Sequence, residues 1–296
     1  MSYSNSRELR QSDMEEVKQL IMTLLNPENN PSTRAIKKGT GCWIVLWEKW
    51  QRLTISQDVV DLYKANGITN MGVPDPIPET LIALKGSNIG IILSIPNDNL
   101  QALTDPNEAY KWVVDNVISY IAQQVITKFR LQNRVKVSTN IENRLLVNTI
   151  LPSESIFRKD VSSSINPIIE FLKQNNASLL ANFYPYSAYI REPDRIGLRY
   201  ALFTKPKANP SGYYNLFDAM LDSVYYAIEN AGGGNNMEII VSGSGWPSAG
   251  GRRANVRNAA TYYTNLLKHV KSRTGTTYKP GKAIETYLYT MFDENL

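Results

Sequence analysis

The chain has 296 residues, of which 43% are hydrophobic and 20% charged, with a net charge of +5 and one cysteine. This length and composition are typical of a soluble globular protein that forms one large domain or two smaller ones. The single cysteine, Cys42, excludes an internal disulfide and a cysteine-based zinc site. The lysines and arginines are dispersed, with one short basic group at 252–257, so we expect no nucleic-acid partner.

The first twenty residues, MSYSNSRELRQSDMEEVKQL, are charged where a secretory signal needs an apolar run. The chain as written therefore predicts no signal peptide and a cytoplasmic location. No stretch of about 18 apolar residues occurs, which predicts that nothing spans a membrane.

Short β-rich runs alternate with amphipathic helical stretches after residue 55. In chain order, strands are predicted at 68–73, 89–95, 135–139, 178–184, 237–242 and 283–292, and helices at 79–85, 107–123, 161–174, 213–230 and 254–270. Strands joined by crossover helices pair in parallel, and the near-continuous apolar run IGIILSIP is typical of a sheet buried on both faces. The pattern predicts a (β/α)8 barrel, although six strands are two fewer than eight.

The predicted strand at 237–242 leads directly into GSGWPSAG. Active sites of such barrels lie at the carboxyl ends of the strands, where Gly243 falls. A glycine offers no reactive side chain, so the strand delivers no chemical group to the place where one is expected.

Several segments together resemble the plant endo-1,3-β-glucanases of glycoside hydrolase family 17. They include VVDLYKANGI, LLANFYPYSAY, YNLFDAMLDSVYYAIENAGG, VSGSGWPSAGG and AIETYLYTMFDEN, in the family's order. The resemblance implies a (β/α)8 barrel over residues 56–296, preceded by an atypical segment at 1–55. It also implies a secreted retaining hydrolase with a β-1,3-glucan partner and no metal or cofactor; the sequence leaves the oligomeric state open.

Retaining hydrolysis needs two carboxyl groups, one as nucleophile and one as general acid. The family's nucleophile is the glutamate of VSESGWPSAG, and Gly243 stands at that position. The family's general acid lies on a YIAVGNE strand that follows a KFR-like triplet, but here KFR at 128–130 runs directly into LQNRVKVST. We therefore expect that this strand, the fourth of the family, is absent and that no intact catalytic residue remains.

The family's first strand is also missing or replaced. Residues 47–56 are WEKWQRLTIS. One set of codons that encodes these residues, when it is read one base later, encodes GKNGNDLPS, which resembles the family's opening pattern. We therefore interpret residues up to about 55 as read out of frame. Residues 41–47, GCWIVLW, are a candidate to fill this gap as a strand, and nothing obvious fills the other.

Six residues are candidates for contact with sugar. Glu285 and Glu294 correspond to cleft carboxylates of the family, with solvated or salt-bridged loop carboxylates as the alternative. The aromatic candidates for stacking on sugar rings are Tyr184, Tyr186, Trp246 and Phe292, with ordinary core or rim packing as the alternative. The single histidine, His269, is predicted to be a surface residue of its helix.

Three functions remain open from the sequence. The first is a catalytically impaired member of the endo-1,3-β-glucanase family, the second is a non-catalytic β-1,3-glucan-binding protein, and the third is a non-functional gene product. A barrel that lacks strands has unpaired edges, which favours aggregation in the third case.

Overall fold

The structure is a computed structural model that describes residues 42–45, 57–73, 78–93 and 138–289, together with positions 108 and 111. The N-terminal segment at 1–41, the predicted helix at 107–123 apart from positions 108 and 111, the junction after Arg130, and the residues from 290 onward lie outside these ranges.

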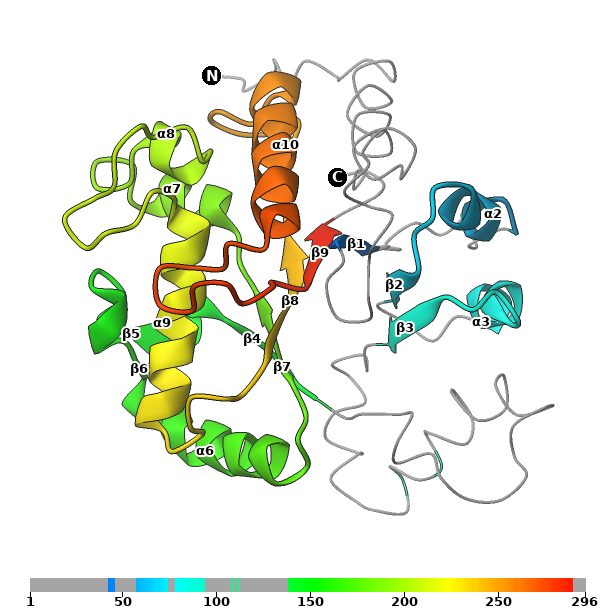
Figure 1. The fold of residues 1–296 in the computed structure, drawn as a ribbon, viewed down its shortest axis with the longest axis horizontal. Helices are drawn as coiled ribbons and strands as arrows, with labels where there is room; N and C mark the ends of the chain where they lie inside the picture. Colours follow the sequence, from blue (N-terminus) through cyan, green and yellow to red (C-terminus); the bar gives the residue numbers. More distant parts are fainter. Residues whose placement is uncertain are drawn as a thin grey trace, which may run out of the picture.

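The centre of the molecule is a seven-stranded sheet in the order β3-β2-β1-β9-β8-β7-β4 (Figure 1). All six strand pairs are parallel. The strands are β1 (Cys42–Val45), β2 (Asn70–Val73), β3 (Gly90–Leu93), β4 (Asn140–Glu142), β7 (Leu179–Asn182), β8 (Ile239–Ser244) and β9 (Thr286–Tyr289). A separate antiparallel pair consists of β5 (Leu146–Val147) and β6 (Ile156–Phe157).

The prediction that residues 41–47 supply a strand is confirmed. Strand β1 lies between β2 and β9, with Cys42 in register with Thr286 and Ile44 in register with Met71. Apolar and β-branched residues suit a strand with neighbours on both sides, which explains why this segment occupies the position. The candidate segment thus supplies a strand of the sheet at Cys42–Val45.

The parallel α/β class is confirmed, and a closed barrel is not established. Among the described strands, β3 and β4 are the two edges of the sheet. The chain that connects them, at 94–137, contains the junction after Arg130 where the sequence predicts a missing strand. The expected incompleteness of the barrel therefore falls between these two strands and stays a prediction.

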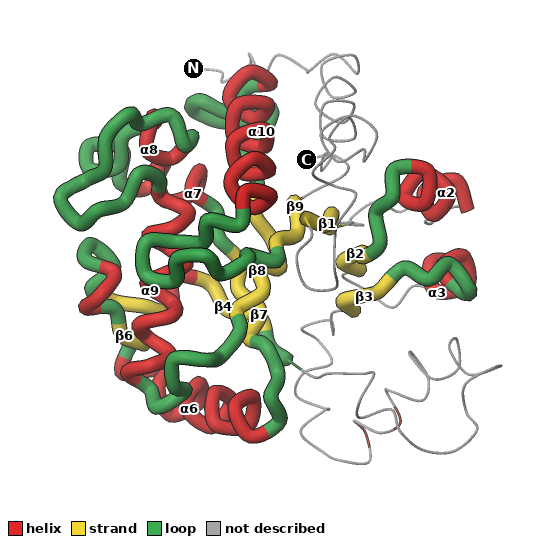
Figure 2. The backbone as a smooth tube through the Cα atoms, in the orientation of Figure 1, coloured by secondary structure: helices red, strands yellow, loops and turns green. Residues whose placement is uncertain are grey.

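Helices lie between many of the strands along the chain, with three in succession between β7 and β8; Figure 2 colours helices red and strands yellow. They are α2 (Gln57–Ala65), α3 (Pro78–Leu84), α6 (Lys159–Gln174), α7 (Pro185–Arg191), α8 (Leu198–Ala201), α9 (Leu216–Asn230) and α10 (Val256–Ser272), with single 3-10 turns at Asn143–Leu145 and Pro152–Glu154. Asn215 and Asn255 cap α9 and α10, each accepting a hydrogen bond from a backbone N–H in the first turn. These side chains satisfy backbone donors that would otherwise lack partners, which fixes where each helix begins.

Burial along the strands identifies the two faces of the sheet. On β7 and β8, Leu179, Ala181, Ile239 and Val241 are almost fully buried, whereas the residues between them are only half-buried. The buried row belongs to the same hydrophobic core as α6, α9 and α10. The alternate row therefore lies on the opposite face of the sheet, which we call the inner face.

The predicted strands at 68–73, 89–95, 178–184, 237–242 and 283–292 correspond to β2, β3, β7, β8 and β9. Of the strand predicted at 135–139, positions 135–137 lie outside the described residues, and Ser138 and Thr139 precede β4, which begins at Asn140. The β-branched residues of VKVST were the reason for predicting a strand there. The observed strand β4 is the segment that pairs in parallel with β7.

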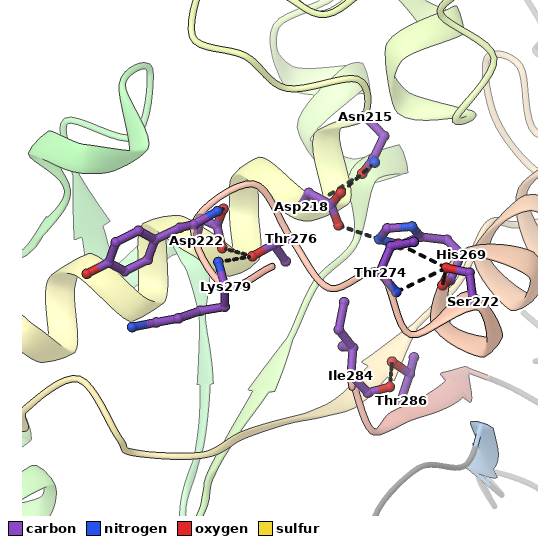
Figure 3. Close-up of polar contacts among 11 residues, drawn as sticks. Asn215, Asp218, Asp222, His269, Ser272, Thr274, Thr276, Lys279, Ile284 and Thr286 are labelled. Atoms are coloured by element: carbon purple, nitrogen blue, oxygen red, sulfur yellow. Dashed lines mark hydrogen bonds and ion pairs between the residues drawn. The ribbon is translucent and has the colours of Figure 1, made fainter. Parts of the chain in front are cut away.

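The prediction that His269 is a surface residue is wrong. Its side chain is 17% exposed and its Nε2 lies 2.7 Å from Oδ1 of Asp218, which is 10% exposed (Figure 3). The ring also packs against Phe203 and Phe217. The helix pattern alone did not reveal this contact because α9, which carries Asp218, is 51 residues away in the chain.

Two further observations concern the described part of the chain. Its helices include none long and apolar enough to cross a membrane. Its histidine, cysteine, aspartate and glutamate side chains form no group of three or more that could hold a metal ion.

Candidate active site at the carboxyl ends of the strands

Three neighbouring strands, β4, β7 and β8, place residues at or next to their carboxyl ends side by side in the sheet. Glu142 of β4 is in register with Asn182 of β7, and Asn182 is in register with Gly243 of β8. A register shift between Ala181 and Asn182 accompanies the second pairing. Because parallel strands end at the same edge, these residues share the face on which barrel enzymes place their active sites.

Gly243 is buried and closely surrounded by polar side-chain atoms. A Cβ atom at this position would lie 2.8 Å from the hydroxyl oxygen of Tyr184 and 2.9 Å from Oδ1 of Asn182. Asn182 Oδ1 also accepts a hydrogen bond from Ser242 Oγ at 3.0 Å. The first atoms of any side chain at residue 243 would therefore overlap the present positions of Tyr184 and Asn182.

The contrast with Gly245 shows that the backbone does not require glycine at 243. A Cβ on Gly245 would lie 2.0 Å from the carbonyl oxygen of Tyr289, a backbone atom that cannot turn aside. At Gly243 both obstacles are the ends of side chains, and its φ is not in the left-handed region. Gly243 is thus a position that can hold a side chain once its neighbours rotate, whereas Gly245 is not.

The aromatic candidates for sugar stacking divide into two groups. Tyr184 and Tyr186 are half-buried, and Tyr184 packs edge-on against Tyr289 with ring centroids 5.6 Å apart. Trp246 is 2% exposed, packs against Tyr186 and Tyr189, and donates its indole N–H to the carbonyl of Arg253 at 3.1 Å. Trp246 is therefore a buried packing partner of Tyr186, and its indole ring has no exposed face on which a sugar ring could stack.

Burial raises the pKa of the Tyr186 hydroxyl above its ordinary value, with a smaller contribution from Tyr189. The hydroxyl therefore stays protonated at neutral pH and can donate a hydrogen bond. It also lies 2.3 Å from the point that a Cβ on Gly251 would occupy. The glycine at 251 thus allows the loop after β8 to approach Tyr186 closely.

The structure does not bring Glu285 together with Gly243. Glu285 precedes β9, and its carbonyl accepts from the backbone N–H of Val241, so it lies at the amino-terminal side of the sheet. Its carboxylate accepts from Tyr287 Oη at 3.4 Å, and Tyr287 in turn accepts from Asn70 at the start of β2. Two residues on β9 and three on β8 separate the backbone positions of Glu285 and Gly243, which is about 7–10 Å along the strands.

The remaining sequence candidates, Phe292 and Glu294, lie outside the described residues. Sequence reasoning missed two residues that the structure places at the site, Asn182 and Glu142. Asn182 is a polar residue that ends the apolar run SLLAN, a signal that was available. Glu142 was missed because its strand was predicted to end at Thr139.

Comparisons with known proteins agree with this geometry. The family model described as "Glycosyl hydrolases family 17" matches residues 49–130 and 120–296. The chain belongs to glycosyl hydrolases family 17.

Similar plant proteins include several glucan endo-1,3-beta-glucosidases. The chain is 49% identical to the glucan endo-1,3-beta-glucosidase acidic isoform GI9 of Nicotiana tabacum, over 82% of this chain and 80% of that protein. It is 38% identical to a probable glucan endo-1,3-beta-glucosidase of Arabidopsis thaliana, over 93% of this chain and 87% of that protein. The resemblance identified from the sequence is therefore confirmed.

Solved structures of the family have the same fold. CJP38, a beta-1,3-glucanase and allergen of Cryptomeria japonica pollen, matches with a TM-score of 0.77 at 32% identity, over 84% of this chain and 89% of that one. A plant beta-glucan endohydrolase also matches with a TM-score of 0.77, at 31% identity, over 86% of this chain and 92% of that one.

Proposed function

We propose that this chain binds β-1,3-glucan at the carboxyl ends of β4, β7 and β8 and that its hydrolytic activity is severely impaired. The substrate class follows from the relatives, which are named as glucan endo-1,3-β-glucosidases. The impairment rests on Gly243 and its surroundings. The observation that carries the proposal is that residue 243, which pairs with Asn182 near the carboxyl end of β8, is a glycine and offers no carboxylate.

The missing side chain at residue 243 removes the attacking group. A retaining glycosidase forms a covalent bond between its nucleophilic carboxylate and the anomeric carbon. Glycine has no atom that can form this bond.

Two features of the comparisons support the loss of the acid-bearing strand. The family model matches in two separate segments, which overlap at residues 120–130, next to the KFR junction. The alignment with isoform GI9 is 275 positions long and covers 82% of this chain, which is about 243 of its 296 residues. About 32 positions of the alignment therefore have no residue in this chain. A strand with its following helix needs about 30 residues or fewer, so a gap of this size is enough to remove both.

Sugar binding requires neither carboxylate. Tyr184 and Tyr186 offer aromatic rings and hydroxyls, and Asn182 and Ser242 offer polar atoms beside Gly243. Apolar surfaces with a few polar groups that fix orientation are typical of small-molecule sites. Phe292 and Glu294 remain candidates for the same cleft.

The test compares binding and hydrolysis on one polymer. Laminarin hydrolysis, followed by the release of reducing ends, should be at least about 10⁴-fold slower than that of an active relative with glutamate at this position. Retardation of the folded chain in a laminarin-containing native gel should persist. Turnover within tenfold of the relative would contradict the impairment, and a folded chain that laminarin does not retard would contradict the binding.

A further inference from the structure

We propose that Glu142 is a sugar-binding residue of this site, whose carboxylate accepts hydrogen bonds from hydroxyl groups of a bound β-1,3-glucan. The inference deepens the proposed function and rests on it. Glu142 lies outside the sequence motifs that carry the family resemblance.

The register of the sheet places Glu142 close to Gly243. Glu142 pairs with Asn182, and Asn182 pairs with Gly243. Neighbouring strands are about 4.8 Å apart, so the Cα atoms of Glu142 and Gly243 are separated by about 10 Å across the end of β7. That span is about the width of two glucose units, so one chain of sugars can contact both positions.

Burial shows that Glu142 points to the inner face of the sheet. Ile141 is 3% exposed and belongs to the hydrophobic core, and its register partner Ala181 is fully buried. Side chains alternate along a strand, so Glu142 projects from the face opposite to Ile141. Asn182 lies on that same face, where it binds Ser242 beside Gly243.

Glu142 is accessible and held in place. Its side chain is 43% exposed, and its Oε2 lies 2.7 Å from both Nε and Nη2 of Arg144, whose side chain is 68% exposed. An ion pair this exposed contributes little to folding, so a ligand can share it at small cost. The contact nevertheless restricts the rotamers of Glu142.

The chemistry of the pair suits a neutral polyol. The carboxylate only accepts hydrogen bonds and the guanidinium only donates them, whereas each sugar hydroxyl can do both. Glu142 with Arg144 can therefore bind two hydroxyls of one glucose unit while Asn182 contacts its neighbour. Hydrogen bonds to ionised groups are stronger than neutral ones, so this carboxylate should contribute strongly to affinity.

The experiment is calorimetric titration of laminarihexaose into the full chain and its variants. Glu142→Gln keeps the shape of the side chain and removes its charge, and we expect the Kd to rise about tenfold. Glu154→Gln is the matched control, because Glu154 is an exposed carboxylate twelve residues further along the chain and outside the strand ends. Its Kd should stay within twofold of the wild type, and both variants should melt at the wild-type temperature.

The outcomes separate this inference from the function on which it rests. A wild-type chain that is folded and does not bind laminarihexaose would overturn both. Wild-type binding that Glu142→Gln leaves within twofold would overturn only the role of Glu142. If Glu142→Gln lowers the melting temperature, Glu142→Asp and Arg144→Gln carry the test, and each should raise the Kd several-fold while the chain stays folded.

Discussion

The hydroxyl oxygen of Tyr184 lies 2.8 Å from the point that a Cβ atom on Gly243 would occupy. Tyr184 follows β7 and Gly243 lies within β8, so the contact depends on how these two strands pair. Real Cβ atoms do not approach a hydroxyl oxygen so closely. The space beside residue 243 is thus already used by the side chains of Tyr184 and Asn182.

This relationship predicts a cost for any side chain at residue 243. Gly243→Ala should lower the free energy of unfolding by about 1–3 kcal/mol, because Tyr184 and Asn182 must move to admit the new atom. Adding Tyr184→Phe removes the hydroxyl that stands in the way and should recover part of this loss. Chemical denaturation of the two single variants and the double variant measures the coupling; strictly additive effects would contradict the overlap.

Restoring a carboxylate should separate the two catalytic lesions. Under the proposed function, Gly243→Glu supplies the missing nucleophile, and the acid that protonates the leaving oxygen is still lacking. Hydrolysis of an aryl β-glucoside with a good leaving group should therefore increase measurably, because it needs little acid assistance, while laminarin hydrolysis stays near the baseline. Gly243→Ala is the matched control for the added bulk. Recovery of laminarin hydrolysis in Gly243→Glu alone would show that a general acid is present after all.

A buried carboxylate on α9 predicts a pH dependence of stability. Asp222 is fully buried and accepts hydrogen bonds from Thr276 Oγ1 and the backbone N–H of Tyr278 (Figure 3 shows the contact with Thr276). Burial is the main cause that raises its pKa from 3.8 to about 6, and the nearby Asp218 adds to the rise, while the hydrogen bonds from Thr276, Tyr278 and Tyr213 oppose it. The folded state therefore binds a proton more tightly at Asp222 than the unfolded state does.

The sign follows from the raised pKa. The stabilising contribution of protonated Asp222 is complete below about pH 4 and is lost as the pH rises through about 6, a change of up to about 3 kcal/mol. Asp222→Asn cannot ionise, so the difference in unfolding free energy between wild type and variant should change by this amount between pH 4 and 7. The exposed Asp58→Asn serves as the control. Parallel stability curves for wild type and Asp222→Asn would contradict the raised pKa.

Two aromatic residues of the site should affect different quantities. Trp246 is buried beneath Tyr186, so Trp246→Ala should lower the free energy of unfolding by about 3–5 kcal/mol. Tyr186→Ala removes a half-buried ring and should mainly raise the Kd for laminarihexaose, by about tenfold or about 1.4 kcal/mol. Thermal melting and calorimetric titration of both variants check this division. A Trp246→Ala variant with wild-type stability would show that the ring faces the ligand instead.

The sequence by itself determined the alternation of strands and helices, the family, and the glycine at residue 243. These features are local: apolar periodicity predicts an element, and short motifs such as GSGWPSAG keep their meaning wherever they lie. The same reasoning correctly predicted a strand at 41–47, because an apolar, β-branched run suits a position between two neighbours.

Only the tertiary structure decided which residues meet. The pairing of β4, β7 and β8 brings Glu142, Asn182 and Gly243 to one level and places Glu285 toward the other end of the sheet. Likewise, the packing of α10 on α9 pairs His269 with Asp218, a contact that periodicity along one helix could not predict. Contacts between residues distant in the chain depend on strand register and helix packing, and a shift of one residue moves every side chain to the other face.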